Sequence, residues 1–195
     1  MSKSDPASHK KERSKAIRWV VTIFFVTILI SGTISLASDV IMENSSMPVA
    51  FLILLVIILI GIIFDIIGMA VATADEKPFH AMAARKVPGA KEAIALLRNA
   101  ERVSSICNDV VGDICGVVSG AASATIAGQI LANFTFTWPQ IITLAMSALA
   151  AGLTVGGKAI GKGFAVNSCI PIVHGVGRMI HWFHGLFTCP KKKKK

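Results

Sequence analysis

The stretch "VAFLILLVIILIGIIFDIIGMAVATA", residues 49–74, decides the fold of this 195-residue chain. It carries one charged side chain, Asp65, and it exceeds the ~20 apolar residues that a helix needs to cross the hydrocarbon core of a bilayer. We therefore expect a transmembrane helix here. A carboxylate inside such a helix is costly unless a partner neutralises it, so Asp65 marks a candidate functional position.

Three further apolar blocks surround this one, at residues 17–37, 107–134 and 138–155. With 53% hydrophobic and 16% charged residues, the chain is predicted to be an all-α integral membrane protein with four transmembrane helices. The first block also resembles a secretory signal, because a basic leader precedes it and the small residues "SLAS" could form a cleavage site at Ala37. Its apolar part is long for a signal core, which favours an uncleaved helix.

The basic residues predict the orientation of the bundle. Lys and Arg number six in the N-terminal tail up to Arg18, six in residues 75–105 and eight after residue 155, while the loops 38–48 and 133–139 contain none. Because basic segments stay in the cytoplasm, we expect a multi-pass protein of the inner or plasma membrane with both termini inside.

The same clusters of positive charge lie beside apolar blocks, which indicates anionic lipid headgroups as partners. The net charge of +9 could instead suggest nucleic acid, but the chain contains no Tyr for base stacking. We therefore expect no nucleic-acid binding.

Four regions follow from these patterns. Residues 1–16 are expected to form a basic cytoplasmic tail and residues 17–37 an extra N-terminal transmembrane helix. Residues 49–165 would form a membrane domain that includes a juxtamembrane linker, 75–105, and residues 166–195 an amphipathic, basic C-terminal tail.

The linker and the tail both show amphipathic patterns. In "AKEAIALLRNAERVSSI" the apolar Ile94 and Leu97 alternate with Lys91 and Arg98, as in a helix that lies on a membrane surface or packs beneath the bundle. The tail mixes apolar and aromatic residues with histidines and ends in five lysines. It is therefore predicted to be an interfacial helix with an electrostatic anchor.

Small residues recur every four positions in the third block, which leaves one helix face nearly bare. They are Gly112, Gly116, Gly120, Ala124 and Gly128, and Gly152 and Gly156 extend the pattern to the fourth block. Such faces predict close helix association within the bundle, across a homodimer, or both.

Three acidic side chains are predicted to lie at similar depths in the membrane. Asp65 lies ~13 Å from the inner end of its predicted helix, Asp113 lies ~12 Å from the same side, and Asp109 is one turn shallower. Mg²⁺ takes oxygen ligands and often only one or two carboxylates. We therefore predict a Mg²⁺ site formed by Asp65, Asn108 and Asp109, with Asp113 as an additional or alternative ligand.

Other interpretations of these acids stay open. Asp65 could be protonated or hydrogen-bonded to small residues, and Asp109 could lie among headgroups near Arg102. A proton relay is a further alternative.

Several apparent motifs carry less weight. "GGKAIGKG", residues 156–163, is close to a phosphate-binding loop, but it follows a membrane helix and Gly163 replaces the required Ser or Thr. We expect no nucleotide binding. His181 and His184 have no neighbouring Cys or carboxylate that would complete a Zn²⁺ site, and the four cysteines form no CxxC pair. Without a Ser/His/Asp or Cys/His set, no enzymatic activity is expected.

The stretches "FDIIG" with "ATAD", "LLRNAERVSSICND" and "GGKAIGK" occur in the order found in the membrane domain of the cyclin-M/CorB/CorC magnesium and cobalt transporters. The chain resembles this family over about two-thirds of its length, and "NAER" followed by "CND" is the most specific part. The resemblance implies Mg²⁺ or Co²⁺ transport without the cystathionine-β-synthase modules, so regulation by ATP is not implied.

The chain departs from the family at the implied ligand positions. Asn108 is retained, whereas a family Ser, Glu, Asn, Glu and Pro are replaced, respectively, by Asp65, Gly68, Asp109, Lys158 and Gly161. A lysine near a cation site opposes binding by charge repulsion. Two hypotheses follow: a divalent-cation transporter, or a transport-incompetent membrane interaction or accessory protein of the same fold.

Overall fold

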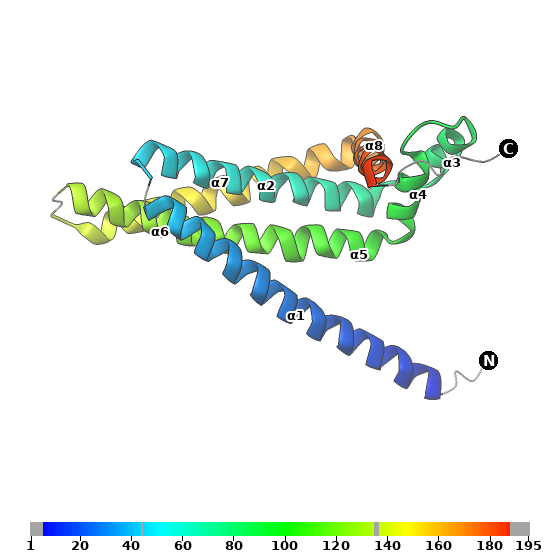
Figure 1. The fold of residues 1–195 in the computed structure, drawn as a ribbon, viewed down its shortest axis with the longest axis horizontal. Helices are drawn as coiled ribbons and strands as arrows, with labels where there is room; N and C mark the ends of the chain where they lie inside the picture. The colour runs from blue at the N-terminus through cyan, green and yellow to red at the C-terminus, as the bar shows by residue number, and fades with distance from the viewer. Residues whose placement is uncertain (1–5, 44, 135–136, 188–195) are drawn as a thin grey trace.

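The computed structural model describes residues 6–43, 45–134 and 137–187, and within these ranges the regular structure is entirely helical (Figure 1). The helices are α1 Pro6–Glu43, α2 Met47–Thr73, α3 Lys77–Ala84, α4 Ala90–Arg98, α5 Ala100–Ser105, the π-helix η1 Ile106–Gly112, α6 Asp113–Asn133, α7 Pro139–Asn167 and α8 Cys169–Phe187. The predicted lysine anchor at residues 191–195 and the N-terminal residues 1–5 lie outside the described residues.

Four helical stretches are long and apolar enough to cross a membrane. They are Ile17–Met42 of α1, Met47–Thr73, the continuous run Ala100–Asn133 through α5, η1 and α6, and Pro139–Asn167. This confirms the all-helical architecture with four candidate spans.

Three of the spans are clearly longer than the sequence predicts, and the third begins at Ala100 instead of residue 107. α1 continues to Glu43, and α7 continues twelve residues past the expected end at residue 155, to Asn167. The hydropathy falls at Gly156, Gly157 and Lys158, but glycine costs a helix only about 1 kcal/mol relative to alanine. Packing against α2 offsets this cost, so the segment "GGKAIGKG" is helical and not a loop.

α2 lies against η1, α6 and α7 and forms the centre of the bundle. α1 packs mainly on α6 and diverges from the other helices toward its N-terminal end (Figure 1). Besides apolar packing, the Gln129 amide donates a hydrogen bond to the Met42 carbonyl (2.8 Å), and the Arg102 guanidinium lies 5.5 Å from the centre of the Trp19 ring.

The segment between α2 and η1 forms three short helices, α3, α4 and α5, and the amphipathic helix predicted from residue 90 onward is divided at Asn99 into α4 and α5. α3, α4 and α8 lie together at one end of the bundle (Figure 1), where Phe79, Ala93, Leu97 and Val173 share a buried core. The N-terminal end of α1 points toward this same end. The placement agrees with the predicted topology, and its assignment to the cytoplasm stays a prediction.

The glycines that bring helices together are mostly not those of the predicted bare faces. A Cβ at Gly61, Gly157 or Gly161 would lie 2.9 Å or less from a side-chain atom of the neighbouring helix. A Cβ at Gly116 or Gly120 would meet no described atom within 4 Å, and the same holds for Gly128, Gly152 and Gly156. Of the predicted glycine positions, Gly112 is the one packed inside the bundle.

Candidate functional site

Asp65 lies in the centre of the bundle and forms an ion pair with Lys158. Its Oδ1 is 3.6 Å from the Lys158 Nζ, and the side chains are 7% and 20% exposed, respectively. At this separation two unit charges attract by roughly 4 to 5 kcal/mol at an effective dielectric constant of about 20. Desolvation costs several kcal/mol per ion and offsets much of this attraction, so the pair is not evidence of stability by itself.

Glycines allow the three helices to meet around this pair. A Cβ on Gly112 of η1 would lie 3.1 Å from the Lys158 Nζ and 3.7 Å from the Asp65 Oδ1. The Gly112 carbonyl also accepts a hydrogen bond from Lys158 (3.4 Å). The ammonium therefore lies between a carboxylate of α2 and a backbone oxygen of η1.

Asn108 occupies the same interface between α2 and η1, one turn toward the end of the bundle where α4 and α8 lie. Its Oδ1 lies directly against Gly68, where a Cβ would overlap it, and its Nδ2 donates to the Ser104 hydroxyl (3.3 Å). Asp65 and Gly68 lie three residues apart on α2, while Asn108 and Gly112 lie four apart on η1. Asp65 and Asn108 are therefore separated by about one turn, ~5 Å along the helix axis.

Two oxygen atoms of this cluster lack a hydrogen-bond partner within the described part of the chain. They are the Asp65 Oδ2 and the Asn108 Oδ1, and both are buried. A buried acceptor without a partner costs about 1 to 3 kcal/mol, more when it is charged, so these atoms are suited to a ligand that supplies positive charge or donors.

The backbone at the site is unusual because η1 is a π-helix of seven residues, Ile106–Gly112. π-helical turns are rare, and those that do occur are frequently found at functional sites. Both Asn108 and the Gly112 carbonyl belong to this segment, so the altered helical geometry sets how they face α2 and α7.

The structure separates the other two predicted ligands from this cluster. Asp109 and Asp113 are exposed on the helix surface, and Asp109 accepts a hydrogen bond from Ser105 (2.9 Å). Across the described residues, no three His, Cys, Asp or Glu side chains are grouped as metal ligands. Of the predicted set, Asp65 and Asn108 thus come together at one buried interface.

Sequence reasoning missed the pairing of Lys158 with Asp65, although depth could have indicated it. Lys158 lies nine residues before Asn167, the end of α7, and Asp65 lies nine residues before Ala74, the C-cap of α2. The two residues are therefore equally deep from the same end of the bundle. Because the sequence prediction ended the fourth helix at residue 155, Lys158 was not expected to lie within that helix at the depth of Asp65.

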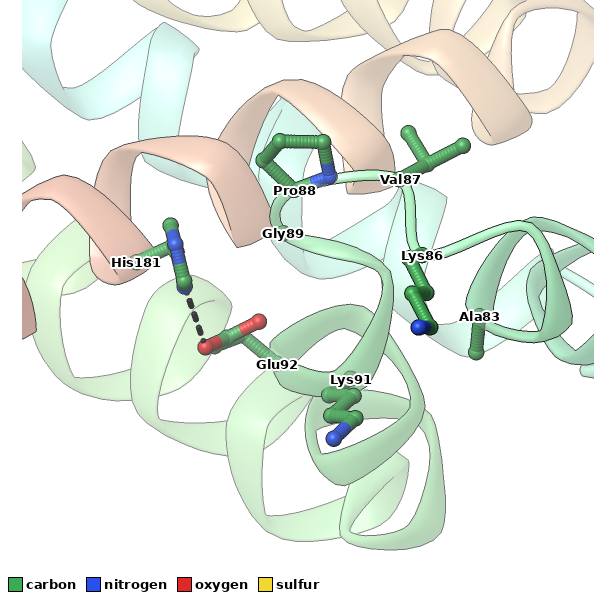
Figure 2. A pocket seen from close by; sticks show the side chains of 8 residues that line it. All are labelled: Ala83, Lys86, Val87, Pro88, Gly89, Lys91, Glu92 and His181. Carbon is green, nitrogen blue, oxygen red and sulfur yellow. Dashed lines mark hydrogen bonds and ion pairs between the residues drawn. The ribbon is translucent and has the colours of Figure 1, made fainter. Parts of the chain in front are cut away.

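A second polar cluster lies where α4 meets α8 (Figure 2). His181 of α8 points toward Glu92 of α4, with the His181 Nδ1 2.8 Å from the Glu92 Oε1. The hydrogen bond from His181 lowers the pKa of Glu92 below its ordinary value, against the opposing effect of burial. The pair borders a hollow of about 360 Å³ that is also lined by Lys86 and Lys91. His181 of α8 is thus paired with a carboxylate of α4.

No protein-family model, curated protein or solved structure matches this chain. The resemblance to the cyclin-M/CorB/CorC family therefore stays a prediction, and function is argued from the site alone.

Proposed function

We propose that this chain is a multi-pass membrane protein that binds a hard divalent cation, Mg²⁺ or the related Co²⁺, at Asp65 and Asn108 and moves it across the membrane. The observation that carries the proposal is the pair of buried oxygens without partners, the Asp65 Oδ2 and the Asn108 Oδ1. One is a carboxylate oxygen and the other an amide oxygen, which are ligand types that Mg²⁺ accepts while it keeps several waters.

Lys158 has a defined part in this proposal. Its ammonium group binds the Asp65 carboxylate in the structure described here, so it acts as a tethered cation that an incoming ion must displace. The lysine stem is long and the side chain is one-fifth exposed, which lets the charge move aside without unfolding the helix. We expect Lys158 to lower the affinity for Mg²⁺ and to prevent an unpaired carboxylate when no ion is bound.

The decisive experiment measures Mg²⁺ binding to the purified full-length protein in detergent, by calorimetry and by the Mg²⁺-dependent shift of the melting temperature. Asp65→Asn should abolish the shift, because the amide removes the only buried negative charge of the site. Lys158→Met should raise the affinity by about tenfold or more, since it removes a like charge beside the ion.

Asp75→Asn is the matched control, because Asp75 is an exposed carboxylate beyond the end of α2. It should leave Mg²⁺ binding unchanged. A Mg²⁺ response of equal size in wild type and Asp65→Asn would exclude the site.

The ion pair itself favours a second candidate function. Because Lys158 already neutralises Asp65, the cluster also suits a transport-incompetent membrane interaction or accessory protein in which the pair only fixes α2 against α7. Uptake of Mg²⁺ into liposomes that contain the purified protein separates the two. Uptake that Asp65→Asn eliminates rules out the accessory role, and its absence in wild type rules out transport.

A further inference from the structure

The orientation of the Asn108 side-chain amide decides which atom the interface between α2 and η1 offers to a ligand. An amide has an acceptor oxygen at one position and a nitrogen with two donor hydrogens at the other. Only the oxygen can coordinate a cation. In the structure the Oδ1 lies against Gly68 and is buried without a hydrogen-bond partner among the described residues, while the Nδ2 is bonded to Ser104. The acceptor is therefore the atom presented to α2.

Gly68 makes room for this oxygen. A Cβ at Gly68 would overlap the Asn108 Oδ1 and would lie 2.9 Å from the Cys107 Cβ. Because glycine has no side chain, the backbone of α2 can approach η1 closely. This approach shields the amide oxygen from solvent.

Ser104 holds the other end of the amide. Its Oγ accepts a hydrogen bond from the Asn108 Nδ2 (3.3 Å), and Ser104 lies four residues earlier, in α5. A hydroxyl can also donate, so in an empty site the amide could turn over and still contact Ser104. A cation removes this choice, because only the orientation with the Oδ1 at the ion keeps both the ion contact and the bond to Ser104.

We propose that Ser104 is a positioning residue, which accepts the hydrogen bond from the Nδ2 so that the amide oxygen of Asn108 stays directed to the cation. The inference rests on the proposed function and identifies a residue that supports one of its two ligands without touching the ion. Loss of a partner that orients a metal ligand typically lowers metal affinity by about 10- to 100-fold.

The position of Ser104 keeps its effect separate from the ion pair. Lys158 binds the Oδ1 of Asp65, whereas Asn108 lies about one turn away, toward the end of the bundle where α4 and α8 lie. A change at Ser104 is therefore expected to alter the Asn108 half of the site and to leave the pair of Asp65 and Lys158 in place.

Substitution of Ser104 tests the proposal, with Mg²⁺ affinity measured by calorimetry on the purified full-length protein in detergent. Ser104→Ala removes the acceptor and should weaken Mg²⁺ binding by about tenfold or more, while the melting temperature without Mg²⁺ stays close to that of wild type. Ser104→Thr keeps the hydroxyl and should bind Mg²⁺ with nearly wild-type affinity, which a purely structural role of Ser104 would not require.

Ser105→Ala is the matched control. Ser105 is the next residue, and its hydroxyl is bonded to the exposed Asp109 (2.9 Å), outside the candidate site. This variant should leave Mg²⁺ affinity unchanged. An equal loss in Ser104→Ala and Ser105→Ala, or a loss in Ser104→Thr as large as in Ser104→Ala, would contradict an orienting role of the Ser104 hydroxyl.

A double-mutant cycle links Ser104 to Asn108. Asn108→Ala, which keeps Asp65, should bind Mg²⁺ more weakly than wild type. Adding Ser104→Ala to it should cause no further loss, because no amide remains to be oriented. A further loss as large as the one that Ser104→Ala causes in wild type would overturn the proposal.

The failure of this inference is distinguishable from the failure of the proposed function. Wild-type affinity in Ser104→Ala, together with binding that Asp65→Asn still abolishes, would remove the role of Ser104 and leave the cation site standing. Absence of Mg²⁺ binding in wild type would overturn both.

Discussion

Asp65 and Lys158 meet at a depth where neither charge would be stable alone. Removing one partner of a buried ion pair leaves an uncompensated charge and typically costs about 3 to 5 kcal/mol, whereas replacing both partners is often neutral. The same pair can therefore contribute little to net stability and yet make either single substitution destabilising.

A double-mutant cycle measures this coupling. In the absence of Mg²⁺, Asp65→Asn and Lys158→Met should each lower the free energy of unfolding by about 3 kcal/mol, and the combined variant should recover most of this loss. Denaturation followed by tryptophan fluorescence in detergent checks it. If the two single effects simply add, the charges do not interact.

At the scale of residues, the sequence predicted that Asp65 is special, because its charge interrupts an apolar run. It could not predict that Asp109 and Asp113 face outward. The π-helical turn of η1 places Asn108 against Gly68, and spacing rules for α-helices do not include that change of register.

At the scale of elements, α7 is held against α2 by direct packing onto glycine. A Cβ at Gly161 would lie 2.8 Å from the Ile66 Cγ1, so a larger side chain requires Ile66 to shift or the two helices to separate. Gly163, two residues later in the same helix, has open space around it among the described residues.

These two glycines form a matched pair of substitutions. Gly161→Leu should destabilise the protein by about 1 to 3 kcal/mol through overpacking, while Gly163→Leu should change stability little. Thermal unfolding of both variants in the same detergent provides the comparison. Equal losses would show that helix propensity and not the contact between α2 and α7 determines the effect.

The α4–α8 joint predicts a dependence on pH. The hydrogen bond from His181 holds the pKa of Glu92 below its ordinary value. The contribution of Glu92 to stability is therefore present above that ordinary pKa and is lost as the pH falls through the lowered pKa. Since the pair is partly exposed, the contribution is expected to be about 0.2 to 1 kcal/mol.

Glu92→Gln should therefore be less stable than wild type near neutral pH, and the difference should shrink in acid. Melting temperatures recorded across the acidic range measure it. Glu101→Gln, at an exposed position of α5, is the control and should show no such convergence. A difference in melting temperature between Glu92→Gln and wild type that does not change with pH would contradict an ionic contribution of Glu92.

At the scale of the whole molecule, hydropathy and charge counts were sufficient to predict four helices and their order. The prediction started a linker helix after Pro88 and Gly89, where α4 begins, but it continued this helix through Asn99, where the structure ends α4 and begins α5. It also could not tell which glycines lie inside the bundle, since that depends on how each helix is rotated.

The topology is testable by labelling in intact cells. Ala84→Cys lies at the end of α3, and Thr137→Cys lies in the loop before α7, at the opposite end of the bundle. A membrane-impermeant thiol reagent added from outside should label the Thr137 position and spare the Ala84 position until the cells are opened. Labelling of both positions from the same side would contradict the assigned orientation.

The weak association of α1 with its neighbour in sequence has a consequence for how the chain is made. α1 packs chiefly on α6, whose residues are synthesised after α2 and the linker. In the membrane protein that we propose, the first helix would therefore remain in lipid until its partner leaves the ribosome. The surface of α1 is apolar on nearly all sides, which suits a helix that is surrounded by lipid before α6 is synthesised. Assembly would then end with α6 recruiting a helix that has already been inserted.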